Sequence, residues 1–258
     1  MGNKTIDTKQ GHWILAKMGK KVLRPGGKEL TQKLVQNLKI NPEDDIVEFA
    51  PGLGFTASIA LESNPKTYTG IELNEEAASI LRKTIKGKNR KIIIGNAANS
   101  TLSDSTYNKV YGEAMLTMQA DHRKSEIIKE AYRILKTEGL YGVHELGLQP
   151  DDISEEKKAE IQRALAQVIK VNARPLTVTE WRNLLEKEGF NVIKTETSPM
   201  HLLEPQRMID DEGFFRTVKI AFNILTHPQE RKRILAMRKV FSKYQNHLNA
   251  ISIVVEKK

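Results

Sequence analysis

The chain has 258 residues, a formal net charge of +9, no cysteine, and 28% charged against 39% hydrophobic residues. This composition is typical of a globular protein with a full core. It excludes disulfides and thiolate metal sites, and no run approaches the ~18 apolar residues that a membrane span needs. We therefore expect a cytoplasmic protein without a membrane span.

The positive charge is concentrated at the two ends of the chain. Residues 1–40 carry nine Lys or Arg against two acids, and residues 206–258 carry eleven against five, so the remainder has a charge of −4. Basic ends of this kind are found on proteins that contact nucleic acids or anionic membranes. Solvated helix faces have the same composition, so the charge alone leaves both interpretations open.

Two helices are predicted before the first strand, and together they form an N-terminal arm over residues 1–40. Apolar residues from Ile14 to Val22 follow a helical stripe, and after the sequence RPGG leucines recur at four-residue spacing from Leu30 to Leu38. From residue 41 onward, strands and helices alternate.

The alternation runs through five predicted strands and the helices between them. The strands are expected at 45–49, 67–73, 91–95, 108–116 and 139–148, and helices follow the first, second and fourth at 56–63, 74–85 and 125–136. A further helix at 179–190 precedes a strand at 191–197, and the chain ends in a strand at 250–258. Repeated strand–helix units predict an α/β domain with a mostly parallel sheet covered by helices on both faces.

Two helical insertions are expected in this domain, which spans residues 41–258. The first covers about 151–175, with an amphipathic helix at 153–171, and the second covers about 200–249 and contains two helices, the later one announced by Thr226 and Pro228. The later helix has an apolar face and basic residues around it. No aromatic platform or RNA module accompanies it, which favours a lid over a small molecule rather than a nucleic-acid groove.

The sequence VEFAPGLGF predicts a nucleotide pocket. Gly52 and Gly54 follow a buried strand, so the backbone can turn tightly and the next helix can present its free N–H groups to a ligand. Glu72 ends the second strand, where a carboxylate accepts hydrogen bonds from the ribose hydroxyls of an adenosine. The segment GLGFTA also matches the dinucleotide pattern G-x-G-x-x-A, so an NAD-binding protein is the alternative.

An ordered set of motifs resembles the class I S-adenosylmethionine-dependent methyltransferases, in particular the ubiquinone/menaquinone-biosynthesis-like (methyltransferase type 11) group. The motifs are VEFAPGLG for the first glycine motif, GIELN for the ribose acid, GNAAN, ILKTEGLYGV, WRNLLEKEGFNVI before strand six, and AISIVVEKK as the last strand. The resemblance implies a doubly wound, Rossmann-like sheet of seven strands with an antiparallel last strand. It also implies S-adenosylmethionine as the cofactor.

The resemblance assigns cofactor-binding roles position by position. The loop from Ala50 through Pro51 and Gly52 to Gly54 is expected against the methionine part, and Glu48 is expected to orient its amino group, directly or through water. Glu72, followed by Leu73, is expected at the ribose, and Asn96 and Ala97 beside the adenine. Ala50 replaces the first glycine, which we expect to be tolerated only with a negative φ, and Asn96 replaces a frequent Asp.

Candidate acceptor-side residues follow strands four and five, where open α/β sheets bind their ligands. Glu113 and His144 are candidate proton acceptors, and Glu145 lies beside His144. Each has an alternative interpretation. Glu113 instead supports the residues that contact the cofactor, and His144 instead is a buried histidine whose hydrogen bonds are made with the backbone. Met115 and Met118 are candidate substrate contacts or packing residues, and Trp13 either closes over the site or packs its helix against the domain.

The function expected from the resemblance is in-line transfer of a methyl group to a small organic acceptor. The alternatives are an RNA methyltransferase, suggested by the basic ends, and a non-catalytic protein that binds an adenosine ligand. No metal motif is present, and no Asn-Pro-Pro-Tyr type tetrapeptide follows strand four. The sequence leaves open the acceptor, the methylated atom, the use of a general base and the oligomeric state.

Overall fold

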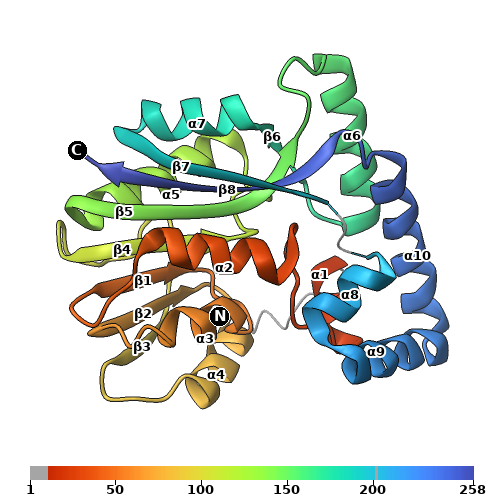
Figure 1. The fold of residues 1–258 in the computed structure, drawn as a ribbon, viewed down its shortest axis with the longest axis horizontal. Coiled ribbons are helices and arrows are strands. Elements are labelled where there is room, and N and C mark those ends of the chain that lie inside the picture. The colour runs from red at the N-terminus through yellow and green to blue at the C-terminus, as the bar shows by residue number, and fades with distance from the viewer. Residues whose placement is uncertain (1–10, 201–202) are drawn as a thin grey trace.

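The structure, a computed structural model, describes residues 11–200 and 203–258 (Figure 1). The first ten residues of the expected N-terminal arm therefore lie outside the described part. Within it, a central sheet occupies one side of the molecule and a group of helices lies at one end of that sheet.

The sheet has the strand order β3-β2-β1-β4-β5-β8-β7, and the two-residue strand β6 pairs with β5. Strands β1 to β5 are parallel, whereas β8 is antiparallel to both β5 and β7. The bounds are β1 Asp45–Phe49, β2 Thr67–Glu72, β3 Arg90–Ile94, β4 Tyr107–Glu113, β5 Leu135–Leu148, β6 Leu176–Thr177, β7 Phe190–Pro199 and β8 Leu248–Lys257. This confirms the predicted doubly wound sheet with an antiparallel last strand.

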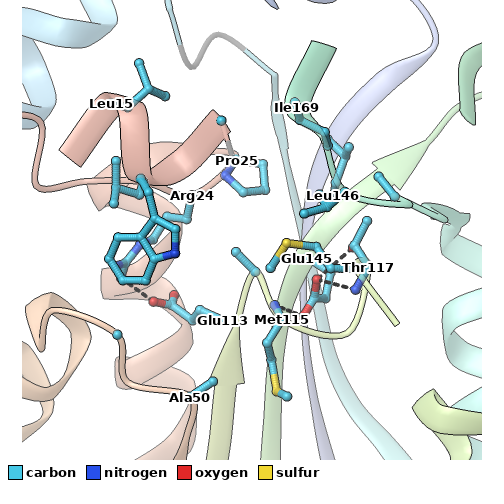
Figure 2. A pocket seen from close by; sticks show the side chains of 18 of the residues that line it. Leu15, Arg24, Pro25, Ala50, Glu113, Met115, Thr117, Glu145, Leu146 and Ile169 are labelled. Atoms are coloured by element: carbon cyan, nitrogen blue, oxygen red, sulfur yellow. Dashed lines mark hydrogen bonds and ion pairs between the residues drawn. The ribbon is translucent and has the colours of Figure 1, made fainter. Parts of the chain in front are cut away.

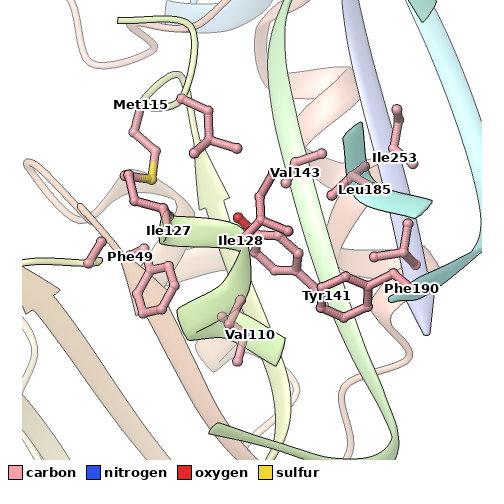
Figure 3. Close-up of a cluster of buried hydrophobic side chains, with 14 of the residues drawn as sticks. Phe49, Val110, Met115, Ile127, Ile128, Tyr141, Val143, Leu185, Phe190 and Ile253 are labelled. Atoms are coloured by element: carbon pink, nitrogen blue, oxygen red, sulfur yellow. The ribbon is translucent and has the colours of Figure 1, made fainter. Parts of the chain in front are cut away.

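Helices cover both faces of the sheet because each presents one apolar stripe to it. On one face, α5 (Asp121–Ile134) and α7 (Val178–Lys187) pack against the inner side chains of β1, β4, β5 and β8, and Figure 3 shows Ile127, Ile128 and Leu185 over Tyr141 and Val143. On the other face, α2 (Gly27–Leu38) and α3 (Phe55–Leu61) bury their apolar residues. The helix α4 (Glu75–Thr84) is capped by the Asn74 side chain, which accepts the Ala77 N–H at 2.9 Å.

The helices of the two insertions form a cap at the carboxyl ends of the parallel strands, and α1 of the arm packs against them (Figure 1). Their bounds are α1 Gly11–Lys17, α6 Glu155–Ile169, α8 Pro205–Glu212, α9 Phe214–Thr226 and α10 Pro228–Lys243. Two small cores hold them together, one between α6, α10 and the ends of β5 and β8, and one between α1, α9 and α10. The cap encloses the edge of the sheet where the glycine motif lies.

Three expectations about the helices were wrong in detail. The first helix ends at Lys17 rather than continuing to Val22, because Gly19 has a φ of +103° and the chain turns there. Residues 200–249 contain three helices, not two, because Gly213 with a φ of +79° separates α8 from α9. Helix α5 begins at Asp121 and gives way to β5 at Leu135, four residues before Gly139.

Candidate functional site

A cavity of about 290 Å³ lies between the carboxyl ends of the parallel strands and the cap (Figure 2). One wall is the glycine turn with Glu72, and another is the loop after β4. The arm, the end of β5 and the helices α6 and α10 form the rest, with Leu15, Leu23, Leu146, Leu165, Ile169, Met237 and Phe241. The cavity therefore has one polar wall and a largely apolar opposite side.

The glycine turn adopts left-handed backbone at three positions. Ala50 has a φ of +52°, so the expectation that its Cβ requires a negative φ was wrong. Gly52 has a φ of +57°, and a Cβ built there meets only the Ala50 carbonyl at 4.0 Å. Gly54 has a φ of +79°, but a Cβ there would lie 2.8 Å from Leu81 Cδ2, so this glycine permits packing against α4.

Glu72 connects the end of β2 to the glycine turn. Its Oε2 accepts the Gly52 N–H at 3.0 Å and its Oε1 accepts the Asn74 N–H at 2.8 Å. Burial raises the pKa of Glu72, and these backbone hydrogen bonds oppose the shift. Each carboxylate oxygen has a second lone pair, so Glu72 can still accept hydrogen bonds from two neighbouring hydroxyls.

Glu48 lies behind the turn rather than in the cavity wall. Its side chain is buried, and its Oε2 accepts hydrogen bonds from the hydroxyls of Tyr68 at 2.7 Å and Tyr111 at 3.1 Å. Burial raises its pKa to about 7 although both tyrosine hydrogen bonds act in the opposite direction. A contact between Glu48 and a cofactor amino group stays a prediction.

The predicted adenine side lies beyond the residues that line the cavity. Leu73 is 71% exposed at the tip of β2. The Asn96 side chain accepts the Ala98 N–H at 3.0 Å, and Ala97 packs in the core beneath it. The cofactor contacts expected of these three residues stay predictions.

Arg24 and His144 hold Glu113 in a buried polar cluster that links the arm to β4 and β5. Arg24 donates to Glu113 and to Thr56, and the Thr56 hydroxyl also donates to Glu113. His144 Nδ1 lies 2.6 Å from Glu113 Oε1, while its Nε2 donates to the Pro25 carbonyl at 2.6 Å. Burial would raise the pKa of Glu113, but its interaction with the Arg24 charge and its hydrogen bonds with His144 and Thr56 outweigh burial and lower the pKa to about 2.

The cluster decides where the two candidate proton acceptors lie. His144 is fully buried, and both of its ring nitrogens already have protein partners. These surroundings match the second interpretation given from the sequence, a buried histidine, rather than a proton acceptor in the cavity. Glu113 lines the cavity, but Arg24 covers it (Figure 2). As placed here, His144 does not reach the cavity.

Glu145 organises the loop after β4. It is fully buried, and its two oxygens accept the N–H groups of Met115, Leu116 and Thr117 at 2.8–3.0 Å and the Thr117 hydroxyl at 2.7 Å. Burial raises its pKa, against the effect of these hydrogen bonds. This carboxylate therefore fixes the wall of the cavity that carries Met115 and Met118.

The candidate substrate residues Trp13, Met115 and Met118 all line the cavity. Sequence reasoning missed Arg24 and Phe55, whose ring centroid lies 4.8 Å from the Arg24 guanidinium carbon. It counted Glu145 among the acceptor-side candidates, whereas in the structure Glu145 accepts hydrogen bonds from the loop after β4. The sequence RPGG marked only a turn, and no local pattern shows that Arg24 reaches a strand end 89 residues away.

The turn and Glu72 fit the adenosine cofactor predicted from the sequence. The space over Gly52 is free of protein atoms, and a carboxylate with spare acceptor capacity stands beside it. Among residues 11–200 and 203–258, no cluster of three or more His, Asp or Glu side chains could hold a metal ion. None of the described helices has the length and apolar character needed to cross a membrane.

A family model described as a methyltransferase domain matches residues 46–139. An uncharacterised protein of Haemophilus influenzae is 32% identical over 251 residues, which cover 96% of this chain and 98% of that protein. The similarity to that protein therefore includes the arm and the cap as well as the matched domain.

Solved structures share the whole fold. The crystal structure of the 4+2 cyclase SpnF has a TM-score of 0.75 at 14% identity and covers 97% of this chain and 94% of that chain. Phosphoethanolamine N-methyltransferase 2 of Haemonchus contortus, in complex with S-adenosyl-L-methionine, has a TM-score of 0.73 at 15% identity and covers 99% of this chain and 58% of that one. At these identities the likeness concerns the fold.

Proposed function

Because the chain belongs to the class I S-adenosylmethionine-dependent methyltransferases, we propose that its acceptor is a small, largely apolar organic molecule. The observation that carries the proposal is the cavity, in which the glycine turn and Glu72 face a wall of aliphatic and thioether side chains from the arm and the cap. A pocket of this size and lining suits a small apolar molecule with few polar groups. The subgroup expected from the sequence stays a prediction.

The bound cofactor supplies an electrophilic methyl group on its sulfonium. The residues of the chain then have to orient the acceptor and exclude water, since positioning alone can contribute about 7 to 11 kcal/mol to such a displacement. Glu72 and the turn at Gly52 hold the nucleoside side, and the apolar wall holds the acceptor. The loop carrying Met115 and Met118, fixed by Glu145, lies between them.

In this proposal Glu113 is a positioning residue, which holds Arg24, and not the proton acceptor. With a pKa of about 2 and hydrogen bonds to Arg24, Thr56 and His144, it stays ionised at neutral pH and is a weak proton acceptor. It instead holds Arg24 and the arm over the cavity. An acceptor with an acidic proton, or one that is already a nucleophile, suits a site of this kind.

The test is a transfer assay with methyl-labelled S-adenosylmethionine and a fractionated cell extract. We expect label in a small compound that partitions into organic solvent. Ile169→Trp, which fills the apolar wall, should raise the KM for that compound and leave the affinity for S-adenosylhomocysteine unchanged. Label in RNA or protein would refute the proposed acceptor class, and cofactor binding without any transfer would favour the adenosine-ligand binding protein.

The cytoplasmic location expected from the sequence stays a prediction.

A further inference from the structure

The outward face of α9 is apolar along its whole length. Phe214, Val218, Phe222 and Leu225 recur at spacings of four, four and three residues, and Phe215 extends the same face. These five side chains are 52–88% exposed, whereas Ile220 on the opposite face is 1% exposed and packs against α1 and α10. We call these five residues the α9 stripe.

The stripe has a basic neighbour. Helix α10 packs beside α9 and exposes Arg231, Lys232, Arg238 and Lys239. From residue 214 to residue 243 the chain has eight Lys or Arg and one acid, Glu230, giving a net charge of +7. Figure 1 shows the α9–α10 pair at the end of the molecule away from the C-terminus.

An exposed phenylalanine-rich face beside exposed Lys and Arg is the pattern of helices that lie in the interface of a membrane. The aromatic and aliphatic side chains enter the boundary between headgroups and acyl chains, and the cations are attracted to anionic headgroups. We propose that the α9–α10 pair docks the protein on an anionic lipid bilayer. This inference does not depend on the identity of the methyl acceptor.

Charge favours a bilayer over a second copy of this chain. A two-fold interface through the stripe would bring two segments of +7 against each other, whereas an anionic surface compensates that charge. RNA would also compensate the charge and could stack on the three phenylalanine rings, but it would leave the aliphatic Val218 and Leu225 in water, whereas a bilayer buries all five side chains. An anionic bilayer can bind both the apolar α9 stripe and the basic residues beside it.

The docking face lies one helix layer from the cavity. Ile220 and Ile224 on the inner side of α9 pack in the same small core as Leu15, Ile169, Met237 and Phe241, and these four also line the cavity. An apolar ligand dissolved in the bilayer would therefore meet the protein beside the wall of the cavity that suits it. Docking at this end leaves the sheet and β7 facing the aqueous side.

The test is co-sedimentation of the purified chain with phosphatidylcholine vesicles, with and without phosphatidylglycerol. We expect binding to the anionic vesicles that falls roughly tenfold or more in F215D/F222D, since each change removes a large apolar side chain from the lipid. The matched control is I94D/I193D, which places the same two charges at apolar residues that are 46% and 54% exposed on the edge strands β3 and β7. Circular dichroism melting curves report whether each variant is folded.

A second pair of variants tests the role of charge. R231Q/K232Q/R238Q/K239Q should weaken vesicle binding at low salt, whereas K83Q/K86Q/K88Q/K91Q removes the same charge from exposed sites near β3 and should leave binding unchanged. Equal binding to neutral and anionic vesicles, or equal losses in both quadruple variants, would overturn the proposal. So would a dimer in sedimentation equilibrium that F222D dissociates, or RNA binding without vesicle binding.

Discussion

Two buried carboxylates at the cavity, Glu113 in its wall and Glu48 behind the glycine turn, have different pKa values because their neighbours differ. Burial would raise the pKa of both, but Glu113 interacts with Arg24, His144 and Thr56, so its pKa falls to about 2, whereas the hydrogen bonds from Tyr68 and Tyr111 do not offset burial at Glu48, and its pKa rises to about 7. The two side chains come from neighbouring strands, β1 and β4. Burial acts on both in the same direction, so the partners decide the outcome.

Replacing Glu72 tests the ribose contact at the level of one side chain. Glu72→Ala should weaken binding of S-adenosylhomocysteine by about 1 to 3 kcal/mol, because charge-assisted hydrogen bonds to the sugar are lost. Isothermal titration calorimetry measures the change. Glu75→Ala, which removes an exposed carboxylate from the first turn of α4, is the control and should bind normally. Unchanged affinity in Glu72→Ala would refute the assignment.

The raised pKa of Glu48 predicts a pH-dependent stability. Between its ordinary value of 4.5 and about 7, the folded chain keeps a proton that the unfolded chain releases, so the free energy of unfolding falls as the pH rises. Glu48→Gln should remove this decline. Relative to the variant, the native protein should lose on the order of 2 kcal/mol between pH 5 and pH 8 in urea denaturation. Parallel pH profiles for the two proteins would contradict the prediction.

At the scale of elements, the two glycines of the turn have different tasks. Gly52→Ala places a Cβ in open space at a φ that Ala50 already adopts, so we expect a loss of about 1 kcal/mol in stability and a clear loss of cofactor affinity. Gly54→Ala brings a Cβ to 2.8 Å from Leu81, so stability should fall by more, about 2 kcal/mol or above. Denaturation and calorimetry on both variants measure the contrast. Equal effects on both properties would show that the turn acts as one unit.

The sequence predicted the strands along the chain because buried apolar runs followed by glycine or acidic residues are local signals. It predicted the turn and Glu72 for the same reason, since both lie next to their strands. It missed the break at Gly213, although a glycine stood there, because the apolar spacing on either side reads as helix. It could not place Arg24 over Glu113, because that contact depends on how the arm crosses the finished sheet.

For the molecule as a whole, arm, sheet and cap each contribute residues to the wall of the cavity, so a bound ligand should join all three. At one hundred times its dissociation constant, S-adenosylhomocysteine should stabilise the folded chain by about 2.7 kcal/mol, and for a chain of this length the melting temperature should rise by about 5 to 10 °C. Differential scanning fluorimetry measures the shift, and Glu72→Ala should reduce it at the same ligand concentration. The loop before α2 lines the cavity through Lys21, Leu23 and Arg24, so trypsin cleavage after the exposed Lys21 should slow in parallel with the shift. NAD serves as the contrasting ligand: a shift with NAD equal to that with S-adenosylhomocysteine would mean that the turn recognises only the adenosine that both contain, and that the cavity does not select the sulfur-containing half.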